Sequence, residues 1–77
     1  MKVTVLFFGI LSEVAGTGTR FYNEIKSLEH LKIRISDDYP EMIHYSYRIS
    51  VNNEITDEDR LLSDGDEIAF LPPFAGG

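Results

Sequence analysis

Apolar residues alternate with other residues along four stretches of this chain, and such a period of two predicts β-strands. The four stretches are residues 2–8, 19–25, 47–51 and 67–71. In the first stretch both alternating sets are largely apolar, as expected of a central strand that is covered on both sides. Asn52-Asn53 favours a tight turn, because asparagine tolerates a positive φ. A short strand at Glu54-Ile55 is expected after it.

A different spacing predicts one main helix. Leu28, Leu31 and Ile35 recur at helical spacing and form one apolar stripe. Ser27 is suited to cap the start of this helix, and Pro40 ends it at or before the preceding residue.

Three shorter stretches are less regular. Residues 11–15 predict a short helical turn that Gly16 ends in a left-handed conformation. Residues 59–62 are expected to form a single helical turn, and Ser63-Asp64-Gly65-Asp66 a reverse turn. Residues 42–46 have no clear pattern.

The order strand, strand, helix, strand, short strand, strand predicts an α+β domain. One amphipathic helix must bury its stripe on one face of a mixed sheet. This is the layout of the β-grasp, or ubiquitin-like, fold, in which the first and last strands lie parallel at the sheet centre. We therefore expect a β-grasp domain over residues 1–71 and an extended C-terminal tail over residues 72–77.

Composition narrows the classes of function. The 77 residues suffice for one domain, and the absence of cysteine excludes disulfides and thiolate metal sites. Seven acidic residues and one arginine lie between Glu54 and Glu67, and acids and bases balance elsewhere, so the net charge of −6 arises there. This acidic region either steers a basic partner or is a solvated turn region. We expect a cytoplasmic protein that binds neither nucleic acid nor membrane.

The tail reads Pro72-Pro73-Phe74-Ala75-Gly76-Gly77. Fully extended, six residues reach about 20 Å, enough to enter a partner's active site. The prolines stiffen the exit, and paired glycines fit a narrow tunnel. The α-carboxylate of Gly77 becomes reactive once it is converted to an acyl-adenylate. A frayed, inert terminus is the alternative.

A docking surface is expected next to the tail. If Val3, Val5, Phe7, Ile68 and Phe70 face the helix, the alternate residues of the same strands face away from it. The resulting apolar patch contains Leu6, Phe8, Ala69 and Leu71, and Ile55 extends it. Such patches usually mark partner sites. Alternatively, Met42, Ile43 and Tyr45 fold back and cover it.

The sequence gives little support for a metal site or for catalytic side chains. His30 and His44 are isolated, so neither a metal site nor a catalytic role is expected. The acidic run Asp57-Glu58-Asp59 does not follow the EF-hand pattern, because Leu61 and Leu62 stand where a ligand and a glycine are needed.

The whole chain resembles the small, sulfur-carrier subunit of molybdopterin synthase. The resemblance rests on residues 3–8, the turn from Leu11 to Gly16, residues 51–54, residues 64–67 and the ending at residues 72–77. The family often has a smaller residue where Phe74 stands, Ala where Gly9 stands and Arg where Ser12 stands. Phe74 implies a roomier groove in the partner.

The resemblance implies a mechanism. An E1-like enzyme uses ATP to adenylate Gly77, sulfur replaces the adenylate, and the thiocarboxylate enters the large synthase subunit to donate sulfur to a pterin precursor. Pro73, Phe74, Ala75 and Gly76 would be inserted with it, while Phe8, Ile55, Ala69 and Leu71 dock. Catalytic side chains would belong to the large subunit, with which the chain forms a heterotetramer, and no cofactor is bound.

Three alternatives remain open. A thiamin-type sulfur carrier would use the same carboxylate for another product. A ubiquitin-like modifier would be conjugated to lysines through Gly77. A plain interaction module would have an inert tail.

Overall fold

The computed structural model describes residues 2–56 and 58–73. In chain order the elements are β1 (Lys2–Phe7), α1 (Ile10–Ala15), β2 (Thr19–Asn23), α2 (Leu28–Asp38), η1 (Pro40–His44), β3 (Arg48–Val51), β4 (Glu54–Thr56) and β5 (Glu67–Leu71). All the predicted strands and the main helix are present, and no end is shifted by more than two residues.

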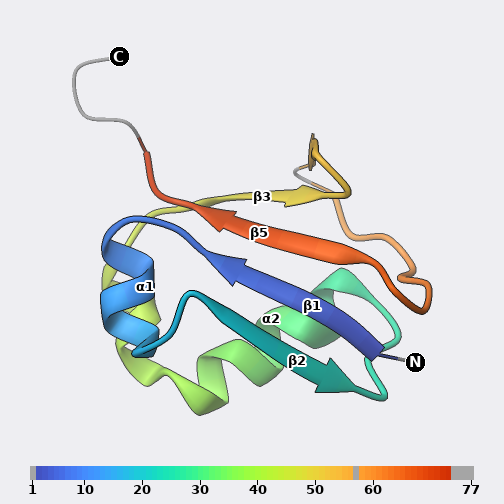
Figure 1. The fold of residues 1–77 in the computed structure, drawn as a ribbon, viewed down its shortest axis with the longest axis horizontal. Coiled ribbons are helices and arrows are strands. Elements are labelled where there is room, and N and C mark those ends of the chain that lie inside the picture. The colour runs from blue at the N-terminus through green and yellow to red at the C-terminus, as the bar shows by residue number, and fades with distance from the viewer. Residues whose placement is uncertain (1, 57, 74–77) are drawn as a thin grey trace.

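The strands form one mixed sheet in the order β2-β1-β5-β3-β4. β1 and β5 are parallel, with Val5 opposite Ile68 and Phe7 opposite Phe70. The pairs β1–β2, β3–β5 and β3–β4 are antiparallel. α2 lies across one face of the sheet, and the chain leaves the sheet beyond β5, at the end where β1 turns into α1 (Figure 1). The predicted β-grasp fold is confirmed.

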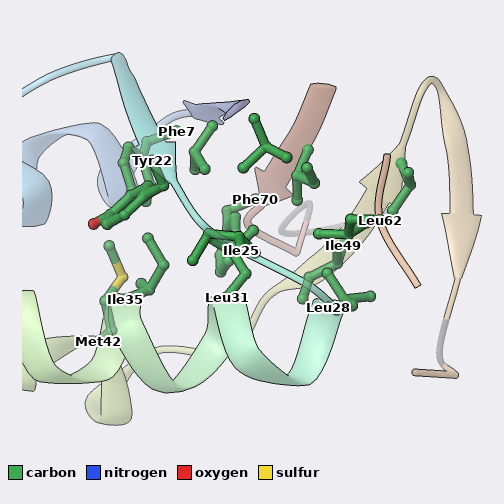
Figure 2. Close-up of a cluster of buried hydrophobic side chains, with 14 of the residues drawn as sticks. Phe7, Tyr22, Ile25, Leu28, Leu31, Ile35, Met42, Ile49, Leu62 and Phe70 are labelled. Atoms are coloured by element: carbon green, nitrogen blue, oxygen red, sulfur yellow. The ribbon is translucent and has the colours of Figure 1, made fainter. Parts of the chain in front are cut away.

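The core lies between α2 and the sheet. Leu28, Leu31 and Ile35 of α2 are at most 3% exposed, and Figure 2 shows these side chains pointing from the helix toward the sheet. The sheet side of the core comprises Val3, Val5, Phe7, Tyr22, Ile49, Val51, Ile68 and Phe70. Burying each large aliphatic side chain contributes about 1.5–3 kcal/mol, so this stripe holds α2 on the sheet.

Local signals at the element ends have the predicted roles. Ser27 is extended and its hydroxyl accepts a hydrogen bond from the His30 amide at 3.1 Å, which caps α2. Gly16 ends α1 with φ 74°. Asn52 and Asn53 make the β3–β4 turn with φ values of 50° and 71°. Residues 40–44, which overlap the irregular stretch 42–46, form the 3-10 helix η1, which buries Met42 in the core.

The helical turn predicted over residues 59–62 is wrong. Leu61 instead forms an antiparallel bridge with Ser27. The Leu28 amide donates to the Arg60 carbonyl, and the Leu62 amide donates to the Lys26 carbonyl, each at 2.9 Å. These backbone groups are therefore paired with the segment before α2. Leu62 is carried into the core and Leu61 stays 81% exposed.

The second strand is also shorter than predicted. It ends at Asn23, because Glu24 takes a positive φ of 60° and turns the chain toward α2. Ile25 lies beyond this turn and is fully buried.

Candidate functional site

The chain leaves the sheet at the end of β5. The Phe8 amide donates to the Phe70 carbonyl at 3.2 Å, and Leu71 is opposite Arg48 on β3. Pro72 and Pro73 follow outside any strand, as expected of residues that cannot donate to a ladder. The predicted insertion residues Phe74, Ala75 and Gly76 and the predicted reacting residue Gly77 lie outside the described residues. Pro73 is the one described member of that set, and it is exposed.

A hollow of about 330 Å³ lies on the face of the sheet away from α2, and we call it the outer groove. Its lining residues are Leu6, Phe8, Ser50, Asn53, Ile55, Glu67, Ala69 and Leu71. The four residues predicted to dock a partner, Phe8, Ile55, Ala69 and Leu71, are therefore brought together. Leu71 places the outer groove directly before the two prolines.

The exposure of the outer groove differs between its walls and its floor. Phe8 is 46% exposed and Ile55 is 56% exposed. Ala69 is only 8% exposed, since it lies on β5 between β1 and β3. Ala69 is thus the floor and the larger side chains are the walls. The sequence did not predict that Ser50, Asn53 and Glu67 would line the groove. Ser50 lies there because it is opposite Ala69 on β5 and opposite Ile55 on β4.

The three residues that could have folded back over the apolar patch lie elsewhere. Met42 belongs to the core under α2, Ile43 is 84% exposed, and Tyr45 lines a different hollow. None of the three lines the outer groove. Within the described chain, this apolar surface therefore faces solvent.

The acidic turn near the outer groove is a hydrogen-bonded clip between three strands. Asp66 accepts from the Ser63 amide at 2.8 Å and from the Asn52 side chain at 2.9 Å. These two hydrogen bonds hold the pKa of Asp66 below its usual range. Asn52 also accepts from the Glu67 amide at 3.0 Å, and Asp64 accepts from the Lys2 amide at 2.7 Å. Residues 51–54 and 64–67, on which the family resemblance partly rests, are thus one structural unit.

A second polar cluster joins β2 to the end of α2. Arg20 donates to the Tyr39 hydroxyl at 2.8 Å and pairs with Asp38 at 3.1 Å, and the Tyr22 hydroxyl donates to the same carboxylate at 2.7 Å. The hydrogen bond to Tyr39 raises the pKa of Arg20, and burial raises the pKa of Tyr22. Both groups keep their protons near neutral pH. The cluster therefore connects β2 to the end of α2 and is not arranged for proton transfer.

His30 and Asp59, from the other candidate sites, both make hydrogen bonds near the start of α2. Among the described residues, no group of three or more His, Asp or Glu side chains could hold a metal ion. His30 Nδ1 accepts from the Lys26 amide at 3.3 Å, and Asp59 accepts from the Glu29 amide at 2.8 Å near the start of α2. Asp57 lies outside the described residues. No helix in residues 2–56 and 58–73 is long and apolar enough to cross a membrane.

A larger hollow of about 450 Å³ lies on the helix side of the sheet, between α2 and the strands β3 and β4. Its lining mixes Lys32 and Arg48 with Glu29, Glu58 and Asp59. Lys32 already pairs with Glu29 at 3.6 Å. This hollow was not expected from the sequence, and its lining of two basic and three acidic side chains favours no particular ligand.

The chain is similar in sequence and in fold to several known proteins. The molybdopterin synthase sulfur carrier subunit of Mycobacterium tuberculosis is 33% identical over an alignment of 82 positions, gaps included, which covers 100% of this chain and 99% of that protein. A chain of the protein–protein complex of subunits 1 and 2 of the molybdopterin-converting factor from Helicobacter pylori 26695 is 29% identical, with a TM-score of 0.76 and full coverage of both chains.

A third similar protein is named for a different role. The small archaeal modifier protein 1 of Methanosarcina acetivorans is 27% identical with a TM-score of 0.83, and the alignment covers 99% of this chain and 96% of that one. Finally, the family model described as the ThiS family matches residues 5–77, almost the whole sequence. The chain therefore belongs to the ThiS family.

Proposed function

We propose that this chain is a sulfur carrier in molybdopterin synthesis that reacts through Gly77. The observation that carries the proposal is the similarity to a molybdopterin synthase sulfur carrier subunit along the entire chain. The family match runs to residue 77, so it includes the paired glycines. The proposal is also supported by the exposed apolar groove beside the end of β5. A carrier that inserts its C-terminal tail into a partner needs a docking surface next to that tail.

The chemistry begins at the Gly77 carboxylate. One carboxylate oxygen attacks the α-phosphorus of ATP on an E1-like partner, and pyrophosphate leaves. A sulfur nucleophile at the oxidation level of hydrosulfide then attacks the acyl carbon, and AMP leaves with the carbon–oxygen bond electrons. The product is a thiocarboxylate. Glycine suits both steps because it has no Cβ to obstruct an approach to the carbonyl.

Delivery follows by docking and insertion. The outer groove binds the large synthase subunit while residues 73–77 enter its active site, where the sulfur passes to the pterin precursor. The similar structure from Helicobacter pylori is described as a complex of two subunits, which supports a large-subunit partner. Carrier and large subunit form a heterotetramer in this proposal, and the catalytic side chains are those of the large subunit.

A reconstitution tests the proposal. The full chain is incubated with ATP and the adenylating enzyme of its own organism, and AMP formation is followed after a sulfide source is added. We expect AMP formation and a thiocarboxylate at residue 77 in the full chain. The matched control lacks Gly77 alone and should give neither product. Equal turnover of the two chains would contradict the assignment of Gly77.

One alternative has a specific observation in its favour. The similarity to a small archaeal modifier protein supports conjugation of this chain to other proteins through Gly77. Both roles share the adenylate and diverge afterwards. Adding a lysine-containing acceptor protein to the reconstitution separates them, since a modifier gives an isopeptide-linked adduct. A thiamin-type carrier gives the same thiocarboxylate but would not support pterin conversion by the large subunit.

A further inference from the structure

The strand register places four lining residues of the outer groove in one row. Ala69 on β5 is opposite Leu6 on β1 and opposite Ser50 on β3. Ser50 is in turn opposite Ile55 on β4, so the row crosses four strands. Ala69 and Ser50, the two small residues at the centre of the row, do not fill the hollow that the larger side chains border.

The groove differs in chemistry on the two sides of this row. Toward the end of β5 lie Phe8 and Leu71, which are both apolar. Toward the start of β5 lie Asn53 and Glu67, which we call the polar end. Glu67 is the one charged residue among the described residues that line the groove. A side chain that filled the groove would therefore contact apolar atoms along its length and a negative charge at one end.

The polar end is held in place by backbone hydrogen bonds that leave its carboxylate free. The Asn52 amide donates to the Glu67 carbonyl at 2.8 Å, and the Glu67 amide donates to the Asn52 side chain at 3.0 Å. Asn52 also donates to Asp66, so this neighbouring carboxylate is already engaged. In residues 2–56 and 58–73, no hydrogen bond or ion pair joins the Glu67 carboxylate to another side chain.

Ser50 supplies a second free polar group, on the floor of the groove. Ser50 is only 7% exposed, and no group in the described part of the chain is hydrogen-bonded to its hydroxyl. No fully buried side-chain oxygen in that part of the chain lacks a partner, so this hydroxyl reaches the open side of the groove. A nearly buried polar group without a partner favours a ligand that can hydrogen-bond to it.

We infer that the outer groove binds an arginine of the large synthase subunit. Its aliphatic stem lies over Ala69, and its guanidinium pairs with Glu67 at the polar end. This inference rests on the proposed function, since it assigns a contact within the proposed docking surface.

Arginine fits both parts of the groove. It combines an apolar stem with a charged head, and the planar guanidinium has five donors for the acceptors of Ser50, Asn53 and Glu67. Two residues along a strand span about 7 Å, so a stem over Ala69 brings its head to Glu67. The acidic region from Glu54 to Glu67, which carries the net charge of −6, attracts a basic partner to this end of the groove.

Titration calorimetry of the full chain with the large subunit of its own organism tests the inference. Glu67→Gln keeps the shape of the side chain and removes its charge. It should weaken binding about tenfold or more, because the partner's arginine is left without its counter-charge in the interface. The melting temperature should stay unchanged, since the Glu67 carboxylate has no partner in the described part of the free chain.

Glu54→Gln is the matched control. It makes the same charge change in the same acidic region, but Glu54 lies outside the groove, so binding should weaken less than about twofold. Equal losses of affinity for the two variants would overturn the inference, because they would show that only the charge of the region matters. No loss in either variant would also overturn it.

A double-mutant cycle identifies the partner residue. Each arginine of the large subunit is replaced by alanine in turn, and binding is measured with the unmodified chain and with the Glu67→Gln variant. One arginine should lose affinity with the unmodified chain and lose little with the variant. Coupling to a lysine instead, or to no basic residue, would overturn the assignment of arginine.

A small probe decides the inference if the large subunit does not bind. Acetyl-arginine amide should shift the backbone amide NMR signals of Ser50, Asn53, Glu67 and Ala69, and acetyl-norleucine amide, which lacks the charge, should shift them less. Glu67→Gln should remove this difference. Shifts by the arginine probe without binding of the large subunit would contradict the proposed function and support the inference. Binding of the large subunit that Glu67→Gln leaves unchanged would do the reverse, and a failure of both probes to bind would overturn both.

Discussion

The two faces of the central strands carry similar apolar residues but differ in what covers them. On the face toward α2, Val5, Ile68 and Phe70 are completely buried. On the other face, Leu6 and Leu71 are half-buried and Phe8 is 46% exposed. One set of alternate residues on these strands thus forms the core, and the other set forms an exposed apolar surface. A domain of 77 residues can use a sheet in this way because one helix covers only one face.

The largest expected effect on stability comes from the covered face. Leu31→Ala removes a fully buried side chain from the centre of the α2 stripe, and it should lower the free energy of unfolding by about 2–5 kcal/mol. Urea denaturation followed by far-UV circular dichroism measures this change. Once the folded fraction is taken into account, partner affinity should be unchanged. A loss below about 1 kcal/mol would mean that the stripe does not hold α2 on the sheet.

A smaller effect, on binding rather than on folding, is expected from the other face. Leu71→Asp places a charge in the outer groove and should weaken binding to the large subunit at least tenfold, as truncation of a central interface residue does. Its effect on the free energy of unfolding should stay below about 1 kcal/mol, since Leu71 is already partly exposed.

Phe21→Asp is the matched control for Leu71→Asp. Phe21 is opposite Thr4 on the same outer face, is 56% exposed and lies outside the groove. Titration calorimetry of both variants should show a loss of affinity for Leu71→Asp alone. Equal losses would indicate that the charge of the whole face matters more than the groove, and no loss in either would move the docking site elsewhere.

The smallest effect is expected at the acidic clip that joins β1, β3 and β5. The pKa of Asp66 is lowered in the folded state, so its ionised form is stabilised by folding. Its contribution is present above the unfolded pKa, near 3.8, and is lost as pH falls through the lower folded value. Unfolding free energies measured from pH 6 down to acid should fall less steeply for Asp66→Asn than for the unmodified chain.

Most of the fold could be predicted because its signals are local. Alternation located the strands, helical spacing located α2, and Ser27, Gly16 and Asn52-Asn53 acted at the positions where their side chains or φ preferences predicted. The failure at residues 59–62 has a non-local cause. A helical turn would satisfy the backbone of Leu61 and Leu62 locally, but pairing with Lys26 and Ser27, distant in sequence, decides their conformation.

The candidate site was predictable to a similar degree. The alternation of β1 and β5 was enough to gather Phe8, Ala69 and Leu71 on one face, and the short strand placed Ile55 beside them. The polar end of the groove could not be foreseen, because it depends on which strands pair across the sheet and on the turn that carries Asn53. The role of Gly77 and the binding of a partner at the outer groove remain predictions.

The most direct test of the central claim is the intact mass of the chain purified from its native host. If the chain is a sulfur carrier, part of the population will show the mass change of one oxygen-to-sulfur exchange, and fragmentation will locate it at Gly77. A host that produces the chain without Gly77 should show no such species. A carrier role would be contradicted by an unmodified mass under conditions in which the host makes molybdopterin, or by sulfur located at any other residue.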